Sequence, residues 1–120
     1  MWSSRLSALS SSDSETNNAR KEGCCLIEIS EFQSLIESIY FEKDSERGSS
    51  ATFMWLSEEV GELSRAIRRG DDHAMREEFA DVLAWTVSLA SLCGVDMGEV
   101  VRKYASGCPK CSAIPCRCRE

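Results

Sequence analysis

The segment from Phe79 to Val95 most limits how this chain can fold, because its apolar residues would surround a helix on almost every side. Such a helix has to be covered by other parts of the protein, at the centre of the fold or in a subunit interface. We predict a helix from about His73 to Cys93, ending at Gly94. Asp81 lies inside the apolar run, where burial of an unpaired carboxylate is energetically costly.

Further helices are predicted on both sides of this segment. Apolar residues at helical spacing predict a helix from about Glu31 to Lys43, with Ser30 and Gln33 as its capping residues. A polar loop is expected from Asp44 to Ser50, and a short helix from about Met97 to Tyr104. The sequence contains no strand-like alternation, so we predict an all-α fold, a bundle of about four helices.

The helix expected from about Ala51 to Arg69 has an apolar stripe and ends before Gly70, a residue that often terminates helices. Glu59 and Glu62 fall together at the edge of the stripe. We therefore expect both glutamates beside the core. The stripe consists of Phe53, Leu56, Val60, Leu63 and Ile67.

Two carboxylate pairs, Glu59 with Glu62 and Glu78 with Asp81, each have the spacing of one helical turn. If their helices pack side by side, four carboxylates share one small volume and cannot all stay ionised without a cation. Hard divalent cations take oxygen ligands, and magnesium is the usual one beside phosphates. A solvated acidic face, or a salt bridge from an arginine to Asp81, is the alternative. The pattern favours a magnesium site.

The bulk properties exclude several classes of partner. With 120 residues and a net charge of −6, the chain forms one domain and is not expected to bind nucleic acid polymers or anionic membranes. No apolar run reaches the roughly 20 residues of a membrane span. Residues 1–18 lack the apolar core of a secretory signal, so we expect a cytoplasmic protein. We predict a disordered extension over 1–28, a helical domain over 29–105 and a separate tail over 106–120.

The tail contains four cysteines in the spacing C-x2-C-x4-C-x-C. In a reducing compartment, clustered cysteines are more often metal ligands than disulfides. This spacing predicts a tetrahedral zinc site that is structural, because no position is left open for catalysis. Redox-active thiols or two disulfides are the alternatives. The predicted ligands are Cys108, Cys111, Cys116 and Cys118.

The spacing of the carboxylates, E-x-x-E followed after 15 residues by E-x-x-D, resembles the signature of the all-α nucleoside triphosphate pyrophosphohydrolases. The runs from Trp55 to Leu63 and from Glu77 to Trp85 are similar to those of MazG-like members. The resemblance covers roughly residues 32–104, and the cysteine-rich tail is similar to one found on a subgroup of MazG-like proteins.

This resemblance implies a homodimer or homotetramer of packed helices that binds Mg²⁺. It implies hydrolysis of a nucleoside triphosphate between its α and β phosphates, giving a monophosphate and pyrophosphate. Glu59 or Glu62 would orient or deprotonate the attacking water. The magnesium ligands implied are Glu59, Glu62, Glu78 and Asp81.

Residues for substrate binding are less strongly indicated. The family often has a phosphate-facing lysine in its last helix, which here would be Lys103, although the asparagine and arginine that often follow it are missing. Trp55 and Trp85 lie on the carboxylate side of their helices and could stack on a base, but core packing is the commoner role. Other candidates for phosphate contact, more often solvated surface residues, are Arg47, Arg65, Arg68, Arg69 and Arg102.

Two other functions fit parts of the sequence. A zinc-tailed helical adaptor without catalysis would need only the fold and the tail, but it would have no reason to keep four mutually repelling carboxylates. A phosphoribosyl-ATP pyrophosphohydrolase uses a similar carboxylate motif, but the tail and the tryptophans beside the motif fit MazG-like proteins better. The sequence does not identify the nucleotide.

Overall fold

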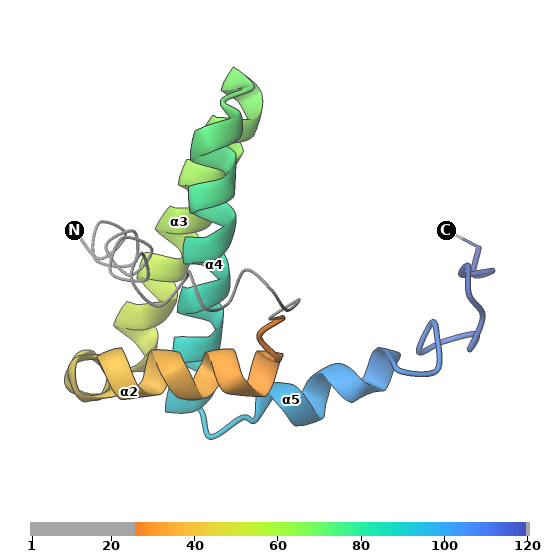
Figure 1. Ribbon diagram of the computed structural model, residues 1–120, viewed down its shortest axis with the longest axis horizontal. Coiled ribbons are helices and arrows are strands. Elements are labelled where there is room, and N and C mark those ends of the chain that lie inside the picture. The colour runs from red at the N-terminus through yellow and green to blue at the C-terminus, as the bar shows by residue number, and fades with distance from the viewer. Residues whose placement is uncertain (1–25, 120) are drawn as a thin grey trace.

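The protein is all-α in the computed structural model, which describes residues 26–119 (Figure 1). Within these residues no strand occurs, so the predicted fold class is confirmed. No single described helix is long and apolar enough to cross a membrane; one pair passes that test only jointly, Asp72–Leu92 with Met97–Tyr104, and is bent by 106°. The elements are α2 (Ile29–Arg47), α3 (Ser49–Arg69), α4 (Asp72–Leu92), α5 (Met97–Val100) and a 3₁₀ helix, η1 (Val101–Tyr104).

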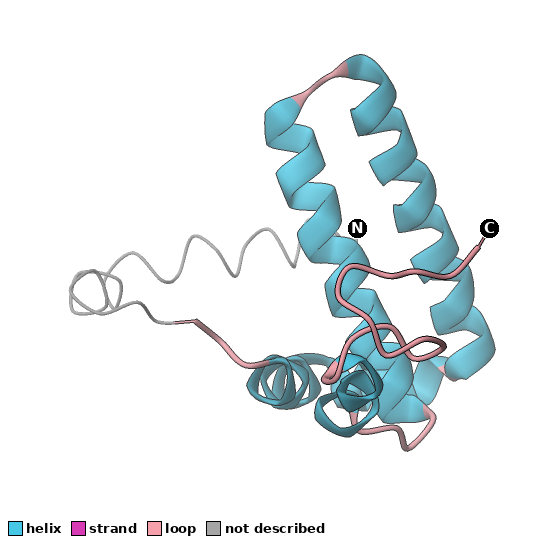
Figure 2. Ribbon diagram, turned by 90° about the vertical axis from the view of Figure 1, so that its right-hand side faces the viewer, coloured by secondary structure: helices cyan, strands magenta, loops and turns pink. Residues whose placement is uncertain are grey.

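Helices α3 and α4 form an antiparallel hairpin, and α2 crosses the end of the hairpin opposite its turn (Figures 1 and 2). The turn follows from local chemistry. Gly70 takes up the left-handed conformation, with φ of 64°, that ends α3. The Asp71 carboxylate then accepts a hydrogen bond of 3.0 Å from the Ala74 N–H and caps α4.

One predicted element is wrong. The loop expected from Asp44 to Ser50 is absent: α2 continues to Arg47, α3 begins at Ser49, and only Gly48, with φ of 85°, separates them. Polarity misled the prediction, because Asp44 is buried and its carboxylate pairs with Arg47 at 2.8 Å. The helix expected over Met97–Tyr104 is found at those residues, as α5 to Val100 and as the 3₁₀ helix η1 from Val101.

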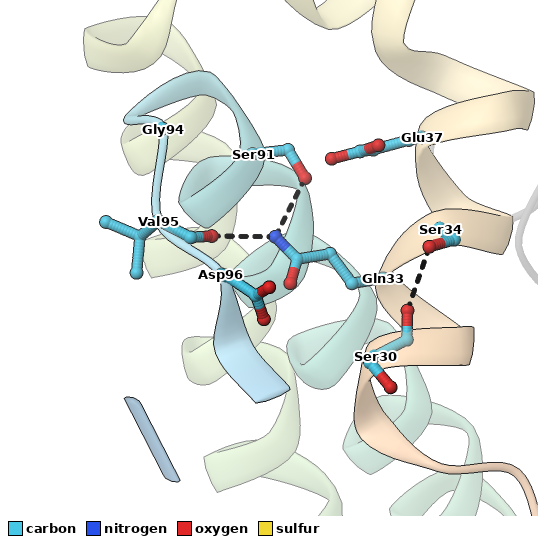
Figure 3. A pocket seen from close by; sticks show the side chains of 8 residues that line it. All are labelled: Ser30, Gln33, Ser34, Glu37, Ser91, Gly94, Val95 and Asp96. Atoms are coloured by element: carbon cyan, nitrogen blue, oxygen red, sulfur yellow. Dashed lines mark hydrogen bonds between the residues drawn. The ribbon is translucent and has the colours of Figure 1, made fainter. Parts of the chain in front are cut away.

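The predicted cap of α2 is also wrong, because Gln33 has a different role. The capping box is formed by Glu28 and Glu31. The Gln33 amide instead donates to the Val95 carbonyl at 2.8 Å and accepts from the Met97 N–H at 2.8 Å. It also donates to the Ser91 hydroxyl at 3.1 Å (Figure 3). Gln33 therefore holds the start of α2 against the segment that joins α4 to α5.

The core lies where α2 crosses the hairpin. The α3 stripe was predicted to face it, but Phe53, Val60 and Ile67 are exposed in the single chain. Helix α3 instead buries Thr52, Glu59 and Ala66 against its neighbours. The side of α3 that carries the carboxylates therefore faces inward. Core residues are Ile36, Tyr40, Ala84, Trp85 and Val87, with Phe32, Leu56 and Met97 packed beside them.

Candidate metal centres

Side chains of α3 and α4 meet in successive layers along the hairpin. The layers are one helical turn apart on both helices, because the two helices are antiparallel. From the α2 end toward the turn, the layers are Trp55 with Trp85, Glu59 with Asp81, and Glu62 with Glu78. The two tryptophan rings are stacked, the carboxylates of the second layer belong to one cluster, and the residues of the third layer line one pocket.

Three of the four predicted magnesium ligands form one compact group. Glu59, Glu78 and Asp81 each offer a carboxylate oxygen, and these oxygens lie within 4.8 Å of one another. Glu59 and Asp81 are each only 3% exposed. The Glu78 Oε2 atom is buried and has no hydrogen-bond partner among the described residues. Buried carboxylate oxygens at this spacing are the donors that a hard divalent cation requires, so the residues fit Mg²⁺.

The acid–base properties of the cluster point in the same direction. Burial, followed by the neighbouring charges of Glu59 and Glu78, raises the pKa of Asp81 to about 7. Burial also raises the pKa of Glu78, with Glu59 as the next cause. Without a cation, protons therefore neutralise part of the cluster near neutral pH. A divalent cation would displace them and stabilise the ionised carboxylates.

Glu62, the fourth predicted ligand, lies beside this group and outside it. Its carboxylate contacts the Arg65 guanidinium at 3.4 Å, and the two side chains are 38% and 53% exposed. Both residues line a pocket of about 120 Å³ that also includes Glu78 and Arg69. The sequence predicts Arg65 and Arg69 only as candidates for phosphate contact and does not predict the pocket. The relevant signal was the spacing of Arg65 and Arg69, which places both one turn apart on one edge of α3.

The predicted tryptophans lie next to the cluster, and only one of them has an open surface. Their ring centroids are 6.2 Å apart and the ring planes differ by 11°. Trp85 is fully buried, whereas Trp55 is 36% exposed. The guanidinium carbon of Arg47 lies 5.2 Å from the Trp85 ring centroid, while Arg47 also pairs with Asp44. Arg47 is thus engaged in the core, and Trp55 is the ring available to a ligand.

The structure does not bring Lys103 to the carboxylates. Its ammonium lies 5.0 Å from the ring centroid of Tyr104 in the same turn. Figure 1 shows α5 and the segment after it running away from the α3–α4 hairpin. No contact among the described residues links Lys103 to the carboxylate cluster.

The four tail cysteines converge as predicted, with their sulfur atoms within 4.8 Å of one another. None of the four is in a disulfide. The Cys108–Cys118, Cys111–Cys116 and Cys108–Cys116 sulfur separations are 3.8, 3.9 and 3.5 Å. A tetrahedron with zinc–sulfur bonds of about 2.3 Å has edges of about 3.8 Å, so these separations fit a zinc site. They are well above the sulfur–sulfur bond of about 2.05 Å in a disulfide.

Backbone groups around two of the sulfurs, those of Cys108 and Cys111, favour the charged form. The Arg117 N–H donates to the Cys111 sulfur at 3.4 Å. This bond, followed by one from the backbone of Ala113, lowers the pKa of Cys111 to about 6. The fold of the tail also needs Gly107, with φ of 106°, because an added Cβ would lie 2.9 Å from the Ile114 side chain. Cys108 and Cys111 therefore favour the thiolate, which is the zinc-binding form, whereas hydrogen bonds with the neighbouring thiols, that of Cys116 first, raise the pKa of Cys118 to about 11.

Comparison with known proteins identifies the family of this chain. No curated protein gives a significant match to the chain. The family model described as the MazG nucleotide pyrophosphohydrolase domain matches residues 47–112, more than half of the chain. The matched region includes all four predicted magnesium ligands and ends inside the cysteine tail. This chain therefore belongs to the MazG family of nucleotide pyrophosphohydrolases, and it is a hydrolase.

Proposed function

We propose that the protein is a Mg²⁺-dependent nucleoside triphosphate pyrophosphohydrolase. It would convert a ribo- or deoxynucleoside triphosphate and water into the monophosphate and pyrophosphate, and so could clean the nucleotide pool. The observation that carries the proposal is the buried group of Glu59, Glu78 and Asp81, whose ligand oxygens lie within 4.8 Å of one another. This group costs stability unless a cation binds it.

In this mechanism the chain positions charges and supplies little covalent chemistry. Glu59, Glu78 and Asp81 would hold the metal, and Glu62, which contacts Arg65 beside the group, would be the fourth ligand. Bound Mg²⁺ would neutralise phosphate charge and polarise the reacting oxygens. The water is oriented by Glu59 or Glu62. The greater exposure of Glu62, at 38% of its side chain, favours Glu62 for that role.

We propose that the nucleobase stacks on Trp55. Its ring is the exposed member of the Trp55–Trp85 pair and lies one turn from Glu59. Trp85 supports this ring from the core and does not touch the substrate, because it is fully buried. Stacking accepts any base, so the aromatic pair alone does not select one. A phosphate contact from Lys103 remains a prediction that no described contact supports.

We further propose a homodimer or homotetramer. Helices α3 and α4 each leave large apolar side chains exposed in the single chain, and exposed apolar surface of this kind marks an interaction surface. Burying it in a second copy would give α4 the all-round cover that its sequence requires. The exposed residues are Phe53, Val60, Ile67, Phe79 and Leu83.

For the tail, we propose a structural Zn²⁺ held by all four cysteines, and a reducing cytoplasm as the compartment that keeps them as thiols. The sulfur separations of 3.5–3.9 Å support this proposal. The bound ion would fold residues 106–119, which are too few to form a core of their own.

The function is tested by an end-point assay with ribo- and deoxynucleoside triphosphates and phosphoribosyl-ATP, in Mg²⁺ and without it. We expect monophosphate and pyrophosphate, or the corresponding pair from phosphoribosyl-ATP, only with metal. Diphosphate and inorganic phosphate would show cleavage of a different bond and refute the proposal. Absence of products from every nucleotide would favour the adaptor function. Glu59→Gln and Asp81→Asn should each abolish turnover while helical content is retained.

A further inference from the structure

We propose that Arg65 and Arg69 form the subsite for the two terminal phosphates of the substrate, which leave as pyrophosphate. The inference rests on the proposed function, because it places the substrate of that reaction. Both side chains line the pocket of about 120 Å³ between α3 and the start of α4. Glu62 and Glu78 line the same pocket, so it adjoins the carboxylate cluster directly.

The pocket supplies what the cluster lacks, namely positive charge for the distal phosphates. Guanidinium groups bind phosphate oxygens with paired hydrogen bonds. Of the three arginines near the end of α3, Arg65 and Arg69 line the pocket, while Arg68 does not. Arg47 is engaged by Asp44 and Trp85. Arg65 and Arg69 are therefore basic side chains that line the pocket next to the cluster.

Three carboxylates, those of Glu62, Asp71 and Glu78, line the same pocket, so phosphate binding by the arginines requires that these carboxylates be engaged elsewhere. The Asp71 carboxylate is occupied in capping α4 through the Ala74 N–H. Glu78 belongs to the metal cluster, and its charge would be used by the cation. The start of α4, a helix of 21 residues, adds the positive end of its dipole on the same side.

The layers then give the substrate a direction along the hairpin. Trp55 lies one turn from the cluster toward α2, and the arginine pocket lies on the other side, toward the turn. Arg65 and Arg69 follow Trp55 by ten and fourteen residues, a rise of about 15–21 Å along α3. This matches an extended nucleoside triphosphate with its base on Trp55, its α-phosphate at the cluster and its terminal phosphates at Arg65 and Arg69.

The contact between Glu62 and Arg65 couples the subsite to metal binding. At 3.4 Å and largely exposed, it is a weak ion pair that is readily exchanged. When the cluster binds a cation, Glu62 turns toward it and releases the Arg65 guanidinium to phosphate. Metal should therefore strengthen pyrophosphate binding, and pyrophosphate should strengthen metal binding by the same factor.

Calorimetric titration of the intact protein with inorganic pyrophosphate, with and without Mg²⁺, tests the subsite. Arg65→Gln and Arg69→Gln should each weaken Mg²⁺-dependent pyrophosphate binding about tenfold, the size expected for a lost charged hydrogen bond. Arg68→Gln, on the same helix but outside the pocket, should leave it unchanged. Nucleoside monophosphate binding should survive both pocket substitutions.

Several results would overturn the inference. They are equal weakening by Arg68→Gln, no weakening by either pocket variant, or no pyrophosphate binding by the wild-type protein. The proposed function is judged separately by turnover. Normal nucleotide hydrolysis with pyrophosphate affinity unchanged in both variants would refute the subsite alone. Pyrophosphate binding through both arginines, without hydrolysis of any nucleotide, would refute the function alone.

Discussion

Trp55 and Trp85 stack almost in parallel, with ring centroids 6.2 Å apart, one helical turn from Glu59 and Asp81 on their respective helices. The stack is asymmetric. Trp85 is fully buried, whereas 36% of Trp55 is exposed. A single aromatic layer therefore joins the core to the edge of the carboxylate cluster, and its two rings should respond differently to substitution.

Trp55→Ala should raise KM for nucleotides by about 5- to 150-fold, the equivalent of roughly 1–3 kcal/mol for a lost base stack. Trp55→Phe should recover part of the loss, because a smaller aromatic face remains. Trp85→Ala should instead destabilise the fold by about 3–5 kcal/mol, since it empties a core position. Steady-state kinetics and urea unfolding separate the two effects. An unchanged KM in Trp55→Ala would contradict stacking on this ring.

Most of the site could be predicted because the spacing of residues along a helix determines which side chains share one face. The one-turn spacing of Glu78 and Asp81, with Asp81 inside an apolar run, predicts a shared carboxylate site, and the structure places both with Glu59. Local periodicity does not fix which face of α3 turns inward, because that depends on how two helices pack. The stripe with Val60 was therefore assigned to the core, although the Glu59 side is the buried one.

The errors near Asp44 and Gln33 have a common physical origin. Polar residues predict a loop or a cap when only their neighbours in sequence are considered. Asp44 is buried with Arg47, and the amide of Gln33 bonds to groups about 60 residues away in the sequence, at Val95 and Met97. Hydrogen-bond partners this far apart in the sequence cannot be predicted from the local sequence pattern.

The pH dependence of stability should report the state of Asp81. The pKa of Asp81 in the folded protein is about 7, above the ordinary value of 3.8. At pH values between these two, the folded state keeps a proton on Asp81 that the unfolded state has lost. This contribution is complete below the unfolded pKa and is lost as pH rises through the folded pKa. Thermal unfolding without Mg²⁺ should therefore show a lower Tm at pH 8 than at pH 5.

Added Mg²⁺ should raise the Tm more at pH 8 than at pH 5, because at pH 8 the ion no longer competes with a proton for the Asp81 carboxylate. The matched control is Asp81→Asn, which cannot titrate and should lose this part of the pH dependence. A wild-type protein whose Tm, relative to Asp81→Asn, does not fall between pH 5 and pH 8 would refute the assignment.

Two ion pairs with the same sequence spacing should contribute very different amounts to the free energy of unfolding. Asp44 is 2% exposed beside Arg47, whereas the Glu62 side chain is 38% exposed beside Arg65. Arg47→Met should cost about 3–5 kcal/mol, because it leaves a buried carboxylate without its guanidinium. Arg65→Met should cost only about 0–1 kcal/mol. Urea unfolding of both variants checks this difference, and equal losses would contradict it.

The exposed apolar residues of α3 should control assembly. Val60→Lys places a charge in the proposed interface and should shift the protein to a monomer in sedimentation experiments, since charges are excluded from interface cores. Glu58→Lys changes an exposed residue on the other side of the same helix and should leave the oligomer intact. A wild-type monomer, or an oligomer that survives Val60→Lys, would show that this face is not the interface.

Loss of zinc should unfold the tail and leave the helices intact. Cys111→Ser removes one ligand from a site whose folding depends on the ion, so the purified variant should contain little zinc where the wild type contains about one ion per chain. Helical circular dichroism should hardly change, because α2, α3 and α4 supply most of the helix and pack mainly with one another. Limited proteolysis should then cut after Tyr104 in the variant only.

Cys93→Ser, which changes an exposed cysteine outside the tail, should keep both zinc and protease resistance. Full zinc content in Cys111→Ser would exclude the four-thiolate site, and wild-type protein isolated without zinc would favour redox chemistry for the same thiols.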